Sequence, residues 1–100
     1  MLVIVWEYMA RKDRVEEFES LYRPDGPWVD LFKKSPGFVS TTLMRDTRDP
    51  HRFVIADRWM SEGAYESFKQ DFASEYTTLS QRGEQLHRAE HLIGRFHFVE

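Results

Sequence analysis

The order of strand-forming and helix-forming segments is the feature that most restricts how this chain of 100 residues can fold. Residues between the first and second strand segments, and between the third and fourth, carry apolar side chains at helical spacing. Only the short run DTRDPH separates the second and third strand segments, which predicts an antiparallel hairpin. The predicted order is therefore β-α-β-β-α-β. The four strand segments, rich in β-branched and aromatic residues, are 2–9, 38–45, 52–59 and 91–99.

Each helical region is predicted to contain two pieces. Pro24 and Pro27 end the first helix, and Pro27 can occupy the first position of a shorter helix that carries Trp28, Leu31 and Phe32. Ser61 is predicted to cap the next helix, because its hydroxyl can accept a hydrogen bond from a free backbone amide. Ser74 is predicted to cap a further helix in the same way. The predicted inner residues of the later helices are Ala64, Tyr65, Phe68, Phe72, Tyr76, Leu79, Gly83 and Leu86.

With right-handed crossovers, this order predicts an α+β, ferredoxin-like fold that spans residues 1–100 as a single domain. Four antiparallel strands would form a sheet with the helices on one face. Both faces of the sheet are apolar by alternation, which is unusual for a face exposed to water. We therefore expect two chains to stack their sheets as a homodimer, the alternative being a monomer whose long connections cover the second face. The alternation places Leu2, Ile4, Trp6 and Tyr8 opposite Val3 and Val5, and Leu92, Phe96 and Phe98 opposite Ile93 and Val99.

Charge and composition exclude several classes of partner. The chain has 14 basic and 17 acidic residues, mixed along its length, so no basic stripe is present to follow a nucleic acid backbone. No segment approaches the roughly 18 apolar residues of a membrane span, and no secretory signal is evident. With no cysteine, disulfides and thiolate sites are excluded, and we expect a cytoplasmic protein.

Several short motifs together resemble the antibiotic biosynthesis monooxygenase-like family over nearly the whole chain. They are WEY in the first strand, PDGPW, SPGF, RFVIADRW followed by SEGAYESF, SEYTTL and LIGRF. The resemblance implies a dimeric α/β-barrel of ferredoxin-like protomers, each with a pocket between sheet and helices. Members of this family include cofactor-free monooxygenases that act on aromatic polyketides, quinol oxygenases and haem-degrading enzymes.

The resemblance implies a cofactor-independent monooxygenase acting on a small aromatic or quinol-like substrate. The alternatives are a non-catalytic dimer of the same fold that binds a small molecule or is only structural, and a haem-binding protein. Trp59 matches a tryptophan that recurs in the family. Some oxygenases of the family pair a tryptophan with an asparagine, and the haem enzymes use an asparagine, tryptophan and histidine set. This chain has no asparagine and carries Phe68 near the position of the haem enzymes' tryptophan.

Asp57, Trp59, Glu7 and His87 are the candidate catalytic residues. Asp57 and Trp59 share a strand face with Phe53 and Ile55, so Asp57 would be partly buried and would need a donor, for which Ser40 is the candidate. The competing interpretation is a hydrogen-bonded aspartate near a strand end. Glu7 would face either the helices as a base or a partner chain as an interface residue, and His87 is a further candidate base.

Aromatic side chains are predicted to converge where the helices cover the sheet and to bind the substrate there, although residues at this spacing also form plain cores. The candidate substrate-binding residues are Trp28, Trp59, Tyr65, Phe68, Phe72 and Tyr76. The run HRAEH, with His87, Glu90 and His91, matches the spacing of one class of zinc protease. We expect no metal there, because the run leads directly into a strand and a third ligand is missing.

Overall fold

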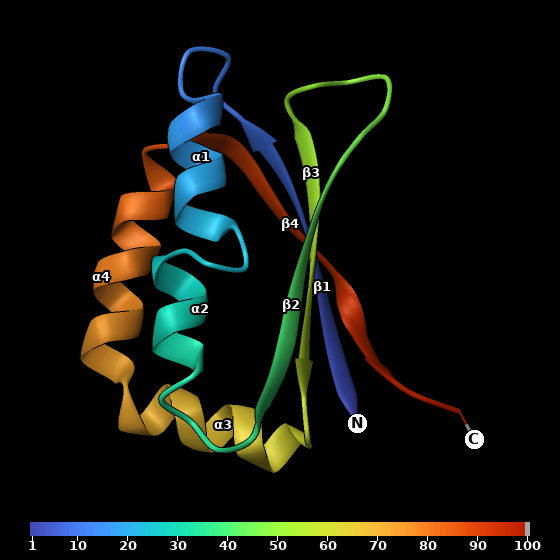
Figure 1. Ribbon diagram of the computed structural model, residues 1–100, viewed down its shortest axis with the longest axis vertical. Helices are drawn as coiled ribbons and strands as arrows, with labels where there is room; N and C mark the ends of the chain where they lie inside the picture. Colours follow the sequence, from blue (N-terminus) through green and yellow to red (C-terminus); the bar gives the residue numbers. More distant parts are fainter. Residues whose placement is uncertain (100) are drawn as a thin grey trace.

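A four-stranded antiparallel sheet carries every helix on one of its two faces (Figure 1). This computed structural model describes residues 1–99, and the strand order is β2-β3-β1-β4. This is the predicted α+β, ferredoxin-like arrangement. In chain order the elements are β1 (Leu2–Ala10), α1 (Val15–Tyr22), α2 (Pro27–Phe32), β2 (Phe38–Arg45), β3 (Arg52–Trp59), α3 (Glu62–Asp71), α4 (Ala73–Glu84) and β4 (His87–His97).

The core lies between the sheet and the helices and is built mainly on the two central strands, β1 and β3. Alternate residues of both strands point toward the helices, as the period of two requires. Burying these side chains is the main favourable contribution to folding, at roughly 25 cal/mol for each Å² of apolar surface removed from water. Those that are at most 6% exposed include Leu2, Ile4, Tyr8, Phe53, Ile55 and Trp59.

Ser61 caps α3 as predicted, since its hydroxyl oxygen accepts a hydrogen bond from the amide of Ala64 at 3.0 Å. The prediction for Ser74 is wrong. Helix α4 begins after Phe72, with no side-chain cap, and the amide of Tyr76 donates to the Phe72 carbonyl at 2.9 Å. Only Phe72 separates α3 from α4. Its backbone carbonyl, rather than a side chain, therefore accepts the first hydrogen bond of α4.

The last strand begins at His87, four residues earlier than predicted, and ends at His97. Its first half is polar because it lies at the edge of the sheet, where side chains remain in water, so the usual strand signal is weak. A bulge between the partners of Val5 and Trp6 also changes the predicted faces. Leu92 lies opposite Trp6 on the helix side, whereas Phe96 lies opposite Val3 on the other side, so these two do not share a face.

The second face of the sheet has no helix over it within residues 1–99 (Figure 1). Strand register places Val3, Val54, Met44 and Phe96 on this face, which we call the open face. Met44 is 45% exposed and Phe96 is 50% exposed. The open face is thus apolar only in part, because the same register also places Glu7, Arg52 and Arg58 on it. No helix within these residues is long and apolar enough to span a membrane.

Candidate active site

A cavity of about 70 Å³ lies between the helix side of the sheet and the helices. Most of its lining side chains are aromatic. Polar side chains lie at its sheet side (Thr41 and Asp57) and at its rim (Glu90). Glu90, on the edge strand β4, has a side chain that is 44% exposed, so the cavity reaches solvent beside this strand. The lining consists of Trp6, Tyr8, Tyr22, Trp28, Phe32, Thr41, Ile55, Asp57, Tyr65, Tyr76, Ser80 and Glu90.

Asp57 is the buried ionisable group of the cavity. It lies on β3, is 7% exposed, and its carboxylate accepts a hydrogen bond from the Thr41 hydroxyl at 2.6 Å. Burial raises the pKa of Asp57 to about 6, and the Thr41 hydrogen bond opposes that rise because it favours the charged form. A carboxylate with this pKa is ionised at neutral pH yet more basic than an ordinary aspartate. It is suited to accept a proton from a bound substrate.

The donor to Asp57 is Thr41, and the prediction of Ser40 is wrong. A register shift between Phe38 and Ser40 moves the pairing of β2 with β3 by one residue. Thr41 consequently lies opposite Asp57 on the helix side, and Ser40 lies opposite Arg58 on the open face. Since side chains alternate along a strand, one bulged residue is enough to exchange the two hydroxyls.

Four tyrosines contribute phenol hydroxyls to the cavity. Burial raises the pKa of each of these phenols above its ordinary value, with the neighbouring Glu90 adding to the rise at Tyr8 and Tyr22. All four are therefore protonated at neutral pH and can donate a hydrogen bond as well as accept one. They are Tyr8, Tyr22, Tyr65 and Tyr76.

Gly83 of α4 makes room for one of these phenols. A Cβ atom at this position would lie 2.2 Å from the hydroxyl oxygen of Tyr22, far closer than van der Waals contact. Any larger residue would push the Tyr22 ring toward the cavity. Gly83 therefore determines the position of the Tyr22 ring, which lines the cavity.

The structure divides the predicted substrate-binding residues into two groups. Trp28, Tyr65 and Tyr76 line the cavity. Trp59 and Phe68 are fully buried in the core next to it, and Phe72 packs against Phe68 with ring centroids 5.8 Å apart. The rings around Trp59 at 5.0–5.4 Å are those of Phe32, Phe38, Tyr65 and Phe68.

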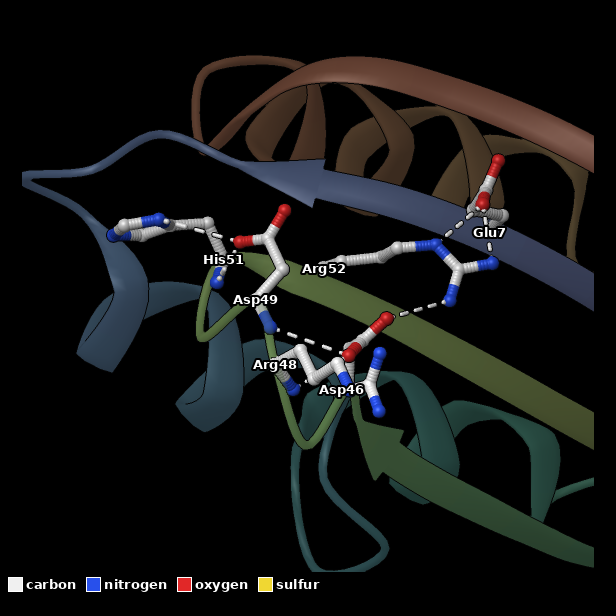
Figure 2. Close-up of polar contacts among 6 residues, drawn as sticks. All are labelled: Glu7, Asp46, Arg48, Asp49, His51 and Arg52. Carbon is white, nitrogen blue, oxygen red and sulfur yellow. Dashed lines mark hydrogen bonds and ion pairs between the residues drawn. The ribbon is translucent and has the colours of Figure 1, made fainter.

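Glu7 lies on the open face, away from the cavity. Arg52 donates to its carboxylate at 2.7 Å through Nε and lies 2.6 Å from it through Nη2 (Figure 2). The third nitrogen of the guanidinium donates to Asp46 at 3.0 Å. The arginine that pairs with Glu7 therefore comes from the same chain, and Glu7 does not reach the groups that line the cavity.

His87 lies on the helix side of β4 beside Tyr8, with ring centroids 5.0 Å apart, but it is not part of the cavity lining. Burial lowers its pKa, so the imidazole is neutral at pH 7. The HRAEH run is a strand, in which register places His87 opposite Ala10 and His91 opposite Glu7 on the other face. Residues 1–99 contain no cluster of three or more groups that could hold a metal.

Eight lining residues were not among the predicted site residues, namely Trp6, Tyr8, Tyr22, Phe32, Thr41, Ile55, Ser80 and Glu90. Tyr8 and Tyr22 carried a usable signal, because both lie on the apolar stripes of their elements. Glu90 carried none, since it sits in a polar run that resembles a helix.

Comparison with known proteins places this chain in a family. A model of the family described as "Antibiotic biosynthesis monooxygenase" matches residues 1–78. The chain belongs to this family. A search of curated proteins found no match.

Solved structures share the fold of this antibiotic biosynthesis monooxygenase family member. SnoaB, a cofactor-independent oxygenase from Streptomyces nogalater, superimposes with a TM-score of 0.83 at 19% identity, covering 99% of this chain and 93% of that one. PA3566 from Pseudomonas aeruginosa gives a TM-score of 0.73 at 18% identity, covering 99% and 94% of the two chains. At such identities the likeness establishes the fold and leaves the chemistry to be argued from the site.

Proposed function

We propose that this protein is a cofactor-independent monooxygenase that oxidises a small phenolic or quinol-like molecule in the cavity beside Asp57. The observation that carries the proposal is a single buried carboxylate, with its pKa raised to about 6, facing a cavity walled by rings. Family membership and the fold shared with SnoaB support the same reaction class.

Asp57 is the proposed base. The substrate enters as a neutral phenol or enol and transfers its acidic proton to the Asp57 carboxylate. Because Asp57 becomes neutral as the substrate becomes an anion, the buried charge is moved rather than created, which limits the electrostatic cost inside the cavity. The protonated phenols of Tyr65 and Tyr76 can then donate hydrogen bonds to the substrate oxyanion.

The remaining steps need only dioxygen. The substrate anion gives one electron to O₂, and the resulting radical and superoxide combine at a ring carbon to form a C–O bond and a peroxide. The protonated Asp57 returns its proton to the peroxide. The second hydrogen then leaves that carbon as a proton to the Asp57 carboxylate while the O–O bond breaks, and the departing hydroxide takes this proton to form water. The products are a carbonyl at that carbon and water, so O₂ takes up the O–H and C–H hydrogens of the phenol or enol and leaves one oxygen atom on the ring.

The cavity volume restricts the substrate. A void of about 150 Å³ admits benzene in a protein core, so a cavity of about 70 Å³ has to widen to receive even one ring. The exposed rim at Glu90 is the place where widening disturbs the fewest packed side chains. This favours a substrate of one or two rings over a large polycycle.

We also propose that two copies stack their open faces as a homodimer in the cytoplasm. The support is the absence of helix cover on that face in residues 1–99 and the half-exposed side chains of Met44 and Phe96. Phe96→Asp would place a charge in that interface, and a dimer in wild-type sedimentation that becomes a monomer in the variant would bear this out. A monomeric wild-type chain at micromolar concentration would refute it.

Oxygen uptake tests the proposed reaction. Wild-type protein is mixed with a hydroquinone of one or two rings, and consumption of O₂ is followed together with the carbonyl product. Asp57→Asn, which keeps the size of the side chain, is expected to lower kcat by about 100-fold or more, in line with the loss of a general base. Ser40→Ala, a neighbouring change on the open face, is expected to leave kcat unchanged.

Full activity in Asp57→Asn would refute the assignment of the base. Tight binding of the phenol without O₂ uptake would instead favour a non-catalytic small-molecule-binding dimer of the same fold. The small volume of the cavity favours that second function over haem binding, and no histidine is among the lining residues within 1–99.

A further inference from the structure

The charged residues that line the cavity within residues 1–99 are of one sign. Two lining residues, Asp57 and Glu90, are carboxylates, and within residues 1–99 the lining contains no lysine, arginine or histidine. Asp57 stands at the sheet side of the cavity and is buried. Glu90 stands at the rim and is 44% exposed, so a molecule that enters passes this second carboxylate.

No lysine or arginine within residues 1–99 forms an ion pair with Glu90. The closest basic atom given by the structure is Nε2 of His87, which lies 3.8 Å from the carboxylate. Burial lowers the pKa of His87, so at pH 7 this imidazole carries no charge. Glu90 therefore lies at the rim of the cavity with no lysine or arginine paired to it among residues 1–99.

Arg95, which lies further along β4, is already engaged elsewhere. Its guanidinium lies over the ring of Tyr65, 5.2 Å from the centroid, and donates to Glu66 at 3.4 Å. Lys69 lies over the same ring at 4.9 Å and is 3.7 Å from Glu66. Both cations thus lie around Tyr65 and are paired with Glu66, so an incoming carboxylate would have to displace that partner.

We propose that the cavity selects its ligand by charge, admitting neutral or cationic phenols and disfavouring those that carry a carboxylate, and that Glu90 is the residue that sets this preference at the entrance. This inference rests on the proposed function, because it specifies the substrate class of the same cavity. The aromatic lining restricts which ligand shapes can bind, and the two carboxylates restrict which ligand charges can bind.

The expected size of the effect follows from Coulomb's law. A ligand carboxylate about 7 Å from Glu90 would lose about 3-fold in affinity in water-like surroundings and about 50-fold at an effective dielectric constant of about 20. Because Glu90 is partly exposed, we expect a value toward the lower part of this range, near 10-fold. Salt should reduce it, since exposed charges are screened.

A series of single-ring phenols tests the proposal with shape held nearly constant. The probes are 4-methylphenol, which is neutral, 4-hydroxybenzoate, an anion, and 4-hydroxybenzylamine, a cation at about pH 7.5. Calorimetric titration gives the affinity of each for wild type, for Glu90→Gln and for Glu75→Gln. Glu75 is exposed on α4 outside the cavity lining, so its variant has the same net charge as Glu90→Gln.

Wild type is expected to bind the neutral and cationic probes about 10-fold more tightly than the anion. Glu90→Gln should bring the anion to within about 2- to 3-fold of the neutral probe, while Glu75→Gln keeps the wild-type ratio. An anion that binds wild type as tightly as 4-methylphenol, an unchanged ratio in Glu90→Gln, or no binding of any probe would overturn the proposal. Oxygen uptake is measured separately, so activity without charge preference refutes only this inference, and preference without uptake refutes only the proposed reaction.

Discussion

Replacing Asp57 with asparagine should make the folded protein more stable at neutral pH, although the same change removes the proposed base. Asp57 is 7% exposed, and its pKa rises from the ordinary value of 3.8 to about 6 in the folded chain. An acid whose pKa is raised by folding holds its proton more tightly in the folded state. Its contribution to the free energy of unfolding is therefore most favourable at low pH, falls as pH rises from 3.8 to about 6, and is constant above that.

The magnitude follows from the two pKa values. Each pKa unit corresponds to about 1.36 kcal/mol, so the ionised Asp57 costs the folded state about 3 kcal/mol at neutral pH. At about pH 4 the folded side chain is protonated and the cost is small, about 0.5 kcal/mol. The advantage of Asp57→Asn over wild type should thus grow by about 2 to 3 kcal/mol between about pH 4 and about pH 7.5.

Urea denaturation at the two pH values, followed by tryptophan fluorescence, measures this difference. Any cost of the new amide that does not depend on pH cancels between the two comparisons. Asp46→Asn serves as a control of opposite sign, because backbone amides and Arg52 lower the pKa of Asp46, so its charge stabilises the fold as pH rises. An advantage of Asp57→Asn that stays constant or shrinks with pH would refute a buried carboxylate of raised pKa.

Three further changes test the packing around the cavity. Thr41→Val removes the hydrogen bond that favours the ionised carboxylate, so the rate of O₂ uptake should reach its plateau about one pH unit higher, as a pH–rate profile would show. Gly83→Ala should displace Tyr22 and weaken binding of 4-methylphenol by about 10-fold in calorimetry, whereas Gly63→Ala, whose Cβ meets only one atom at 3.8 Å, should not. Trp59→Ala should lower the free energy of unfolding by about 3–5 kcal/mol in urea, since it empties a fully buried site, and an effect below about 1 kcal/mol would contradict that placement.

The sequence was sufficient for the fold because strand and helix periods are local properties. The alternation of Phe53, Ile55 and Asp57 on one strand face predicted that Asp57 would be partly buried, and the residue is 7% exposed. Its partner was not predictable, because the register shift between Phe38 and Ser40 depends on how two strands meet. A bulge of this kind leaves no mark in the spacing of residues.

Tertiary packing also decided which aromatic residues form the core and which line the cavity. Trp59 and Tyr65 are both buried and their ring centroids are 5.4 Å apart, yet only Tyr65 lies on the cavity wall. Strand alternation for Trp59 and helical spacing for Tyr65 place both in the same layer and cannot separate them. Glu90 was missed because an exposed edge strand tolerates polar residues, so its sequence resembled a helix.

The pH dependence of kcat/KM for O₂ uptake by the wild-type protein tests the central claim most directly, since this quantity reports the essential base of the free enzyme. The account predicts a rate that rises with pH through an apparent pKa of about 6, the value set by burial of Asp57. A rate that is already at its plateau at about pH 5, or one that rises only with the ionisation of the substrate itself, would contradict it.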